Sequence, residues 1–410
     1  MTNAEYWIWL QTALGYGSPK PIRILEVFNN AKEFYDAGPS GWQKCKAITE
    51  KDVETLKNTS FRKAQEIVLY CVEKCFKILT LDDEDYPIRL TRIKAPPAVL
   101  YIKGEFPDID DEPAIAIIGT RKCSNAGTAL AGTLGYRLSK CGMTVVSGGA
   151  KGCDIAASKG ALNAKSKSII VAGCGLSYPY LMENEEIRNA VANCGAVITE
   201  LQPFDSPYKG SFPVRNRLMS ALTNATLVVE APKISGTQRT VEHALNQGKD
   251  VFVVPGSITS AEYAGNNKLL EDGATPIYTV ADVVSEYISE YPHKLKLDDD
   301  AYTPLGEDKM FNRIYKTLED RKNIKKPQIT KPKTSIVKPK KEISKKPTVN
   351  TAQMSEINAQ IYNFFTKGPA NIDTIIDNLG LDSADVLTAI TELEMEGLIK
   401  SVPGGRYELA

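Results

Sequence analysis

The sequence predicts an α/β protein with three folded parts: a small helical domain, a doubly wound parallel sheet and a C-terminal winged helix. The sheet rests on three observations. Apolar, Val- and Ile-rich runs of strand length recur between about residues 82 and 290, segments of helical periodicity separate most of them, and glycine-rich turns follow them. Such continuous runs are typical of parallel strands that helices cover on both faces. We therefore expect a Rossmann-like domain over residues 81–292, with strands at 114–118, 144–146, 168–172, 196–198, 227–229 and 251–254.

Residues 1–80 are expected to form a separate helical domain. Trp7, Leu10 and Leu14 share one face of a first helix, and a later helix is expected around residues 62–77. The break at residues 15–19, with its two glycines and a proline, resembles a helix-hairpin-helix (SAM-like) turn. A generic helical bundle fits the same pattern equally well.

Residues 293–352 are expected to be a disordered linker rich in Lys and Pro. Between residues 321 and 347, eleven residues are Lys or Arg, four are Pro, and Glu342 is the only acid. A segment of this composition has too little apolar surface to form a core, and it is typical of an extended, solvated spacer.

Residues 353–410 regain the pattern of a folded domain. Three amphipathic helical segments precede a hairpin whose turn is Pro403-Gly404-Gly405, and this order predicts a winged helix. Nine acidic and three basic residues give the segment a net charge of −6, which would repel phosphate. We therefore expect this domain to contact protein rather than DNA.

The composition narrows the function. The chain has 50 basic and 50 acidic residues, so that a nucleic-acid site must be a local patch. No apolar run reaches the roughly 18 residues needed to cross a membrane. The start of the chain lacks a secretion signal, and the cytoplasm is therefore expected.

Several kinds of chemistry are disfavoured. His243 and His293 are the only histidines, and the eight cysteines form no Cys-x-x-Cys pair, so that these cysteines are expected to be reduced thiols. Neither the dinucleotide-binding nor the P-loop glycine motif is present. We expect no catalytic residue, no metal and no cofactor.

Glycine, hydroxyl and basic residues follow the expected strands. In a doubly wound sheet, ligands bind beyond the carboxyl ends of the strands. Glycine turns let backbone N–H groups approach an anion, and helix N-termini add a favourable dipole. Several such turns with Arg121, Lys209, Arg215 and Arg217 close by predict a phosphate-binding surface, and the stretch 209–217 is expected just before a helix.

The ordered set of motifs resembles the DNA-processing protein A (DprA/Smf) family over nearly the whole α/β domain. The resemblance is carried by residues 85–87, 96–104, 117–121, 212–217, 228–231, 235–237, 254–257, 265–266 and 273–274, of which 212–217 is the most specific. The sequence departs from the family at Cys153 and Ser158, where Ile and His often stand.

The resemblance implies a recombination mediator that is a homodimer through its Rossmann-like domain. Such proteins bind and protect single-stranded DNA that enters during natural transformation, and they load RecA recombinase onto it. By position, Arg121 and Lys209 would hold phosphates, Phe212 would stack on a base, and Arg215 and Arg217 would line the same pocket. The candidate DNA-binding residues are Gly119, Thr120, Arg121, Ser124, Gly148, Gly149, Lys151, Lys209, Phe212, Arg215, Asn216, Arg217, Ser235 and Gly236.

Other interpretations stay open. Phe212 could be a core aromatic, and Arg215 could be bonded to a carboxylate. The stretch 235–242 resembles the turn of nucleotide phosphoribohydrolases in which an Arg and a Glu cleave an N-glycosidic bond, although Ile234-Ser235 replaces their Gly-Gly. A third alternative is a transcriptional regulator that places its winged helix on duplex DNA.

Overall fold

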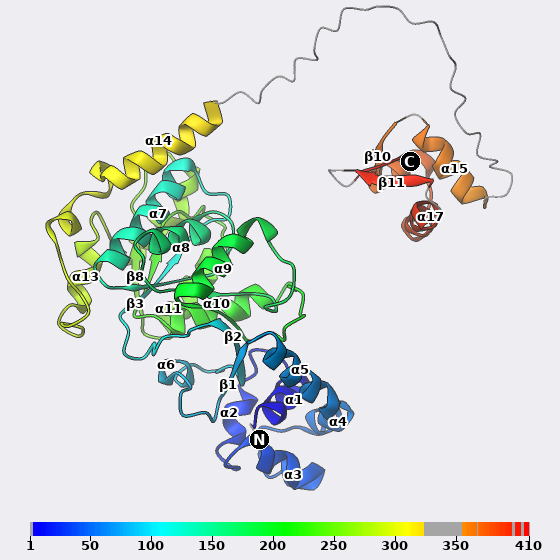
Figure 1. Cartoon of the computed structure of the whole chain (residues 1–410), viewed down its shortest axis with the longest axis horizontal. Helices are drawn as coiled ribbons and strands as arrows, with labels where there is room; N and C mark the ends of the chain where they lie inside the picture. The colour runs from blue at the N-terminus through cyan, green and yellow to red at the C-terminus, as the bar shows by residue number, and fades with distance from the viewer. Residues whose placement is uncertain (1–2, 324–354, 367, 396–397, 403–405, 410) are drawn as a thin grey trace, which may run out of the picture. The chain divides into compact units, whose positions relative to one another are not determined.

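The computed structural model of the chain describes residues 3–323, 355–366, 368–395, 398–402 and 406–409. The chain divides into two compact units, Met1–Gln328 and Ile329–Ala410. The first unit contains the sheet and the N-terminal helices, and the second contains the C-terminal domain (Figure 1).

In the described part of the first unit, nine strands form one sheet in the order β1-β2-β6-β5-β4-β3-β7-β8-β9. Their bounds are β1 Lys77–Thr80, β2 Val99–Gly104, β3 Ala114–Ile118, β4 Thr144–Ser147, β5 Ser168–Val171, β6 Ala196–Thr199, β7 Ala225–Val228, β8 Asp250–Val253 and β9 Thr275–Pro276. The strands from β6 to β9 in this order are parallel, whereas β1 and β2 are antiparallel to their neighbours. The predicted parallel sheet and its six strands, β3 to β8, are confirmed.

Helices cover both faces of the sheet because successive strand residues point to opposite sides. Ile115 and Ile117 pack in one core cluster, and Ala114 and Ile118 pack in the other. The first cluster contains side chains of α7, α8 and α13, and the second contains side chains of α10 and α11. The helices of this region are α7 Asn125–Lys140, α8 Cys153–Asn163, α9 Glu185–Cys194, α10 Ser211–Ala221, α11 Thr237–Asn246, α12 Ala264–Glu271 and α13 Ala281–Tyr287.

The N-terminal helices pack against the sheet and share a hydrophobic core with it. They are α1 Ala4–Leu14, α2 Lys20–Ile24, α3 Ala31–Trp42, α4 Glu50–Asn58 and α5 Phe61–Glu73. The buried Gln11 of α1 donates to the Glu200 carbonyl over 2.7 Å and accepts from the Val99 amide over 2.9 Å. The boundary expected at residue 80 is therefore wrong, because β1 already belongs to the sheet and one core cluster spans both parts.

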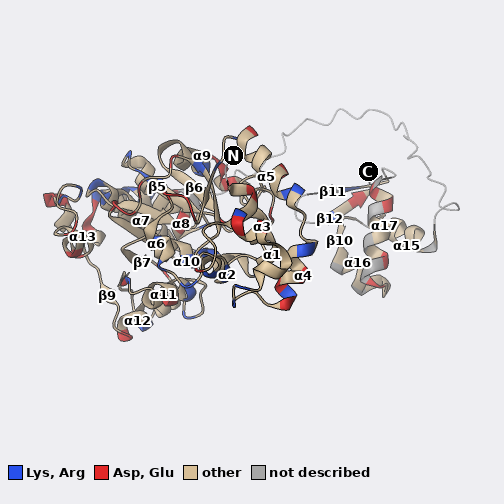
Figure 2. Cartoon of the chain, turned by 90° about the horizontal axis from the view of Figure 1, so that it is seen from below, with Lys and Arg blue, Asp and Glu red and all other residues tan. Residues whose placement is uncertain are grey.

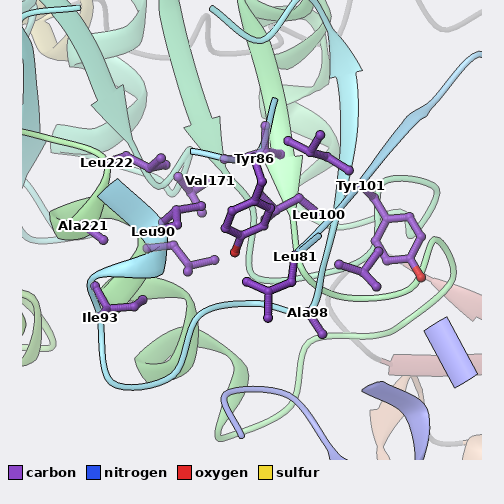
Figure 3. Close-up of a cluster of buried hydrophobic side chains, with 14 of the residues drawn as sticks. Leu81, Tyr86, Leu90, Ile93, Ala98, Leu100, Tyr101, Val171, Ala221 and Leu222 are labelled. Atoms are coloured by element: carbon purple, nitrogen blue, oxygen red, sulfur yellow. The ribbon is translucent and has the colours of Figure 1, made fainter. Parts of the chain in front are cut away.

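The segment between β1 and β3 anchors the far end of α10. Tyr86 donates a hydrogen bond to the Pro97 carbonyl over 2.7 Å. Leu90, in the short helix α6 (Ile88–Thr91), and Leu222, at the end of α10, are fully buried members of one cluster (Figure 3). Truncating a buried leucine such as Leu90 typically costs about 2–5 kcal/mol. This cluster therefore helps to hold the helix that carries Phe212 and Arg215 of the candidate site.

The expected linker begins too early. Residues 299–302 and 305–307 form short 3-10 helices, and α14 (Lys309–Asn323) lies along α7 (Figure 1). Leu295 and Leu305 are buried in the core, and Asp308 forms a buried ion pair with Arg137. The prediction of disorder is thus wrong for residues 293–323, and residues 324–352 lie outside the described part of the chain.

The second unit has the predicted winged-helix pattern. Its elements are α15 Glu356–Phe365, β10 Ala370–Asn371, α16 Ile372–Leu379, α17 Ser383–Met395, β11 Ile399–Val402 and β12 Arg406–Leu409. The strands form a sheet in the order β10-β12-β11, and residues such as Ile361, Ile375 and Leu393 are buried in its core. Acidic residues mark α17 (Figure 2). The hairpin turn at 403–405 lies outside the described residues.

Within the described residues, none of the helices combines the length and the apolar character that crossing a bilayer requires.

Candidate nucleic-acid interface

The sheet has a topological switch point at β3. From β3 the chain adds β4, β5 and β6 on one side of this strand. It then crosses over and adds β7, β8 and β9 on the other side. Such a switch opens a crevice at the carboxyl ends of the strands. A cavity of about 460 Å³ lies there, bounded by the turn after β3, by α8, by α10 and by the loop from β7 into α11.

The structure brings eight of the predicted residues to this cavity. They are Gly119, Thr120, Arg121, Phe212, Arg215, Asn216, Ser235 and Gly236. The other six do not line it: Ser124, Gly148, Gly149, Lys151, Lys209 and Arg217. Figure 2 shows basic and acidic residues interspersed over the first unit, with basic segments near α10.

The stretch 212–217 lies inside a helix rather than before one. Gly210 precedes α10, and Pro213 stands in the first turn, where the missing N–H costs nothing. Residues three or four apart share a helix face. Phe212, Arg215 and Asn216 therefore face the cavity together, and Met219, one turn further on, also lines it.

Arg121 and Phe212 lie side by side in the cavity wall. The Arg121 guanidinium carbon lies 4.6 Å from the centroid of the Phe212 ring, which is a cation–π geometry. The ring is half-buried and lies 5.9 Å, centroid to centroid, from Tyr180. A Cβ atom at Gly173 would stand 2.8 Å from Phe212 Cδ1, and glycine there leaves room for the ring. An exposed cation thus lies beside an aromatic platform.

Arg215 and Asp154 form a buried charged layer beneath this wall. Arg215 Nη1 donates to the Val171 carbonyl over 2.8 Å, while its Nε has no acceptor among the described residues. Burial lowers the pKa of Arg215, and the nearby Asp154 carboxylate opposes that shift. Burial likewise raises the pKa of Asp154, against the effects of Arg215 and of the Ala150 and Gly148 N–H groups. A Cβ atom at Gly148 would overlap the Arg215 guanidinium, which explains the glycine.

Arg217 belongs to the protein interior. Its Nη1 and Nη2 donate to the two carboxylate oxygens of Glu200, each over 2.8 Å, and its Nε donates to the Ala95 carbonyl over 3.1 Å. The Arg217 and Glu200 side chains are 9% and 1% exposed. The expectation that Arg217 lines the same pocket as Arg215 is therefore wrong, because helix geometry turns it toward the core.

The remaining predicted residues support the turns or lie at the surface. Ser124 caps α7, and its backbone N–H and hydroxyl both donate to the buried Glu230 carboxylate, which ties the Arg121 turn to β7. Gly149 adopts a left-handed φ of 63°. Lys151 forms an exposed ion pair with Glu183. Lys209 is exposed in the turn before α10.

Other residues of the cavity were missing from the sequence-based set. Asp154, Thr237, Arg239 and Thr240 line it. Arg239 lies three residues after Gly236, so that the helix beginning at Thr237 brings its side chain back to the turn. This spacing in the sequence indicates that Arg239 belongs to the site. Glu242, which the phosphoribohydrolase interpretation needs, is exposed on α11 and is not among the described lining residues.

Comparisons with known proteins agree with this architecture. Residues 77–288 match the family model described as DNA recombination-mediator protein A, and residues 345–405 match that of the DprA winged helix domain. Protein Smf of Synechocystis sp. is 27% identical over 415 residues, which cover 100% of both chains. DNA processing protein DprA of Streptococcus pneumoniae is 34% identical over 212 residues, 52% of this chain and 74% of that protein. Its X-ray structure aligns with a TM-score of 0.60 and 27% identity, over 73% of this chain and 100% of that one.

Proposed function

The chain belongs to the DNA recombination-mediator protein A family, and we propose that it binds single-stranded DNA in the crevice at the switch point of its sheet. The observation that carries this proposal is the Arg121–Phe212 pair, an exposed cation 4.6 Å from a half-buried ring in a cavity of about 460 Å³.

The chemistry of this wall suits an unpaired strand. Proteins that bind single strands without sequence preference combine positive groups for the phosphates with aromatic rings for the bases. In a duplex the bases are stacked on one another, so that their faces are not available to Phe212. The exposed Arg121, Lys209 and Arg239 would meet the phosphates, and the turn at 119–121 and the N-terminus of α11 would add backbone N–H donors.

We further propose the role that the family resemblance implies. The protein would protect single-stranded DNA during natural transformation, load RecA recombinase onto it, and act as a homodimer through the Rossmann-like domain in the cytoplasm. It would do so without a catalytic residue or a cofactor. Sedimentation of the protein alone and RecA-filament assembly on coated single strands test the dimer and the loading step.

Competition between single-stranded and double-stranded oligonucleotides of equal length tests the binding proposal. We expect the full chain to prefer the single strand, and a chain that ends at residue 352 to keep that preference. Tighter duplex binding that is lost with residues 353–410 would instead favour a winged-helix regulator.

A second assay tests the absence of catalysis. The protein is incubated with AMP, and free adenine is measured by chromatography. We expect no adenine above the level of a protein-free control, because the Glu242 carboxylate lies outside the crevice lining. Turnover that Arg121→Ala abolishes would replace the binding proposal with a nucleotide phosphoribohydrolase.

A further inference from the structure

We propose that Tyr70 and Phe204, with Lys74 beside them, form a second stacking platform for the same DNA strand. The strand would run from Phe212 along residues 173–184 to helix α5. This inference rests on the proposed function and extends the binding site beyond the crevice.

The second platform repeats the chemistry of the first one. The rings of Tyr70 and Phe204 lie 4.4 Å apart, centroid to centroid, at an interplanar angle of 49°. Phe204 is 61% exposed. Lys74 Nζ lies 5.6 Å from the Tyr70 centroid. Tyr70 is half-buried, and Lys74 Nζ also forms an ion pair with Glu73 over 2.9 Å at the surface. A cation beside aromatic rings is the combination that binds successive nucleotides of a single strand.

Phe204 stands on a braced loop between β6 and α10. The Asp205 carboxylate accepts hydrogen bonds from the Tyr16 hydroxyl and, over 3.1 Å, from the Gln202 amide. The Asp205 carbonyl accepts from the Gly175 amide over 2.9 Å. An exposed phenyl ring on a loop held at three points is pre-organised, so that stacking of a base on it carries little ordering cost for the loop.

The loop at 173–184 connects the two platforms. Its Tyr180 contacts Phe212, and its Ser177 hydroxyl lies 2.9 Å from the Tyr70 hydroxyl, within hydrogen-bond distance. The Ser177 amide also donates to the Pro203 carbonyl over 2.8 Å, next to Phe204. One loop therefore contacts both platforms, and the second site is continuous with the proposed DNA crevice.

A second cavity lies along this loop. It has a volume of about 320 Å³, and its lining includes Ser177, Tyr178, Lys103, Arg188 and one acid, Glu185. Arg188 donates to the Leu181 carbonyl over 3.1 Å, which keeps its guanidinium at the loop. Two basic side chains in a cavity along this loop favour a polyanion with flat bases over an uncharged peptide.

Oligothymidylates of about 4 and about 16 nucleotides, near the limits of known single-strand sites, separate the two platforms. Affinities are measured by fluorescence anisotropy on the full chain. We expect Phe204→Ala to weaken binding of the longer strand about 5- to 150-fold, the loss of one stacked base, and to leave the shorter strand unaffected. Phe204→Trp should restore the longer strand. Leu69→Ala, at an exposed apolar residue of α5, is the matched control and should change neither affinity.

The outcomes distinguish this inference from the function on which it rests. If Phe204→Ala binds the longer strand like the wild type while Phe212→Ala weakens both strands, the second platform is refuted and the crevice stands; a protein-docking role for Phe204 would give this result. An equal loss on both strands would also refute the two-platform arrangement. If wild-type protein binds neither strand, the proposed function itself fails.

Discussion

Replacing Phe212 by alanine removes the aromatic ring of the crevice and leaves the helix that carries it. The ring is half-buried, and its centroid lies 5.9 Å from that of Tyr180 and 4.6 Å from the Arg121 guanidinium carbon. An exposed cation–π contact contributes about 0.5–1 kcal/mol. Since a domain of this kind is stable by about 5–15 kcal/mol, the variant should remain folded.

The expected loss in binding follows from stacking. One base stacked on an aromatic side chain contributes roughly 1–3 kcal/mol. Because about 1.4 kcal/mol corresponds to a factor of ten, Phe212→Ala should weaken single-strand binding about 5- to 150-fold.

Fluorescence anisotropy with a labelled oligothymidylate measures this loss, and circular dichroism reports on the fold. Phe311→Ala is the matched control, because Phe311 is also half-buried and stacks on one neighbour, Tyr315, but lies on α14. Wild-type affinity in a folded Phe212→Ala variant would refute the stacking role. An equal loss in Phe311→Ala would point to the fold instead.

Three further predictions concern the support of the crevice. Arg217→Ala leaves the buried Glu200 without its partner and should lower the free energy of unfolding by about 3–5 kcal/mol in urea titration; unchanged stability would contradict the structural role. Gly148→Ala crowds the Arg215 guanidinium and should cost about 1–3 kcal/mol in the same assay, whereas Gly306→Ala, in open space, should cost less. Burial lowers the pKa of His243, so that the unfolded chain binds more protons below pH 6.5 and stability contributed by this group is lost as the pH falls. His243→Gln should flatten the pH dependence of the melting temperature between about pH 7 and 5, and an unchanged profile would refute this assignment.

The regular part of the fold could be predicted from sequence because its signals are local. Five-residue apolar runs such as 114–118 are strands by composition alone. The separation of Arg215 from Arg217 could not be predicted in the same way. Two residues apart on a helix are about 200° apart in direction, so that the helix start at Ser211 decides which arginine faces the cavity.

Long-range packing accounts for the other differences. The Lys- and Pro-rich composition after residue 321 suggested a disordered segment from residue 293 onward. Leu295 and Leu305 instead are buried in a core cluster with side chains of α7 and α13. Arg137 forms an ion pair with Asp308, which lies 171 positions away in the sequence. The Tyr70–Phe204 contact likewise joins residues far apart in the chain. No local pattern contains such contacts.

The salt dependence of single-strand affinity in wild type and Arg121→Ala tests the central claim most directly. For single strands, each neutralised phosphate contributes about 0.7 to the slope of log affinity against log salt. We predict that wild-type affinity falls with salt and that Arg121→Ala binds more weakly with a slope smaller by about 0.7. Identical slopes and affinities in the two proteins would contradict a phosphate site at this crevice.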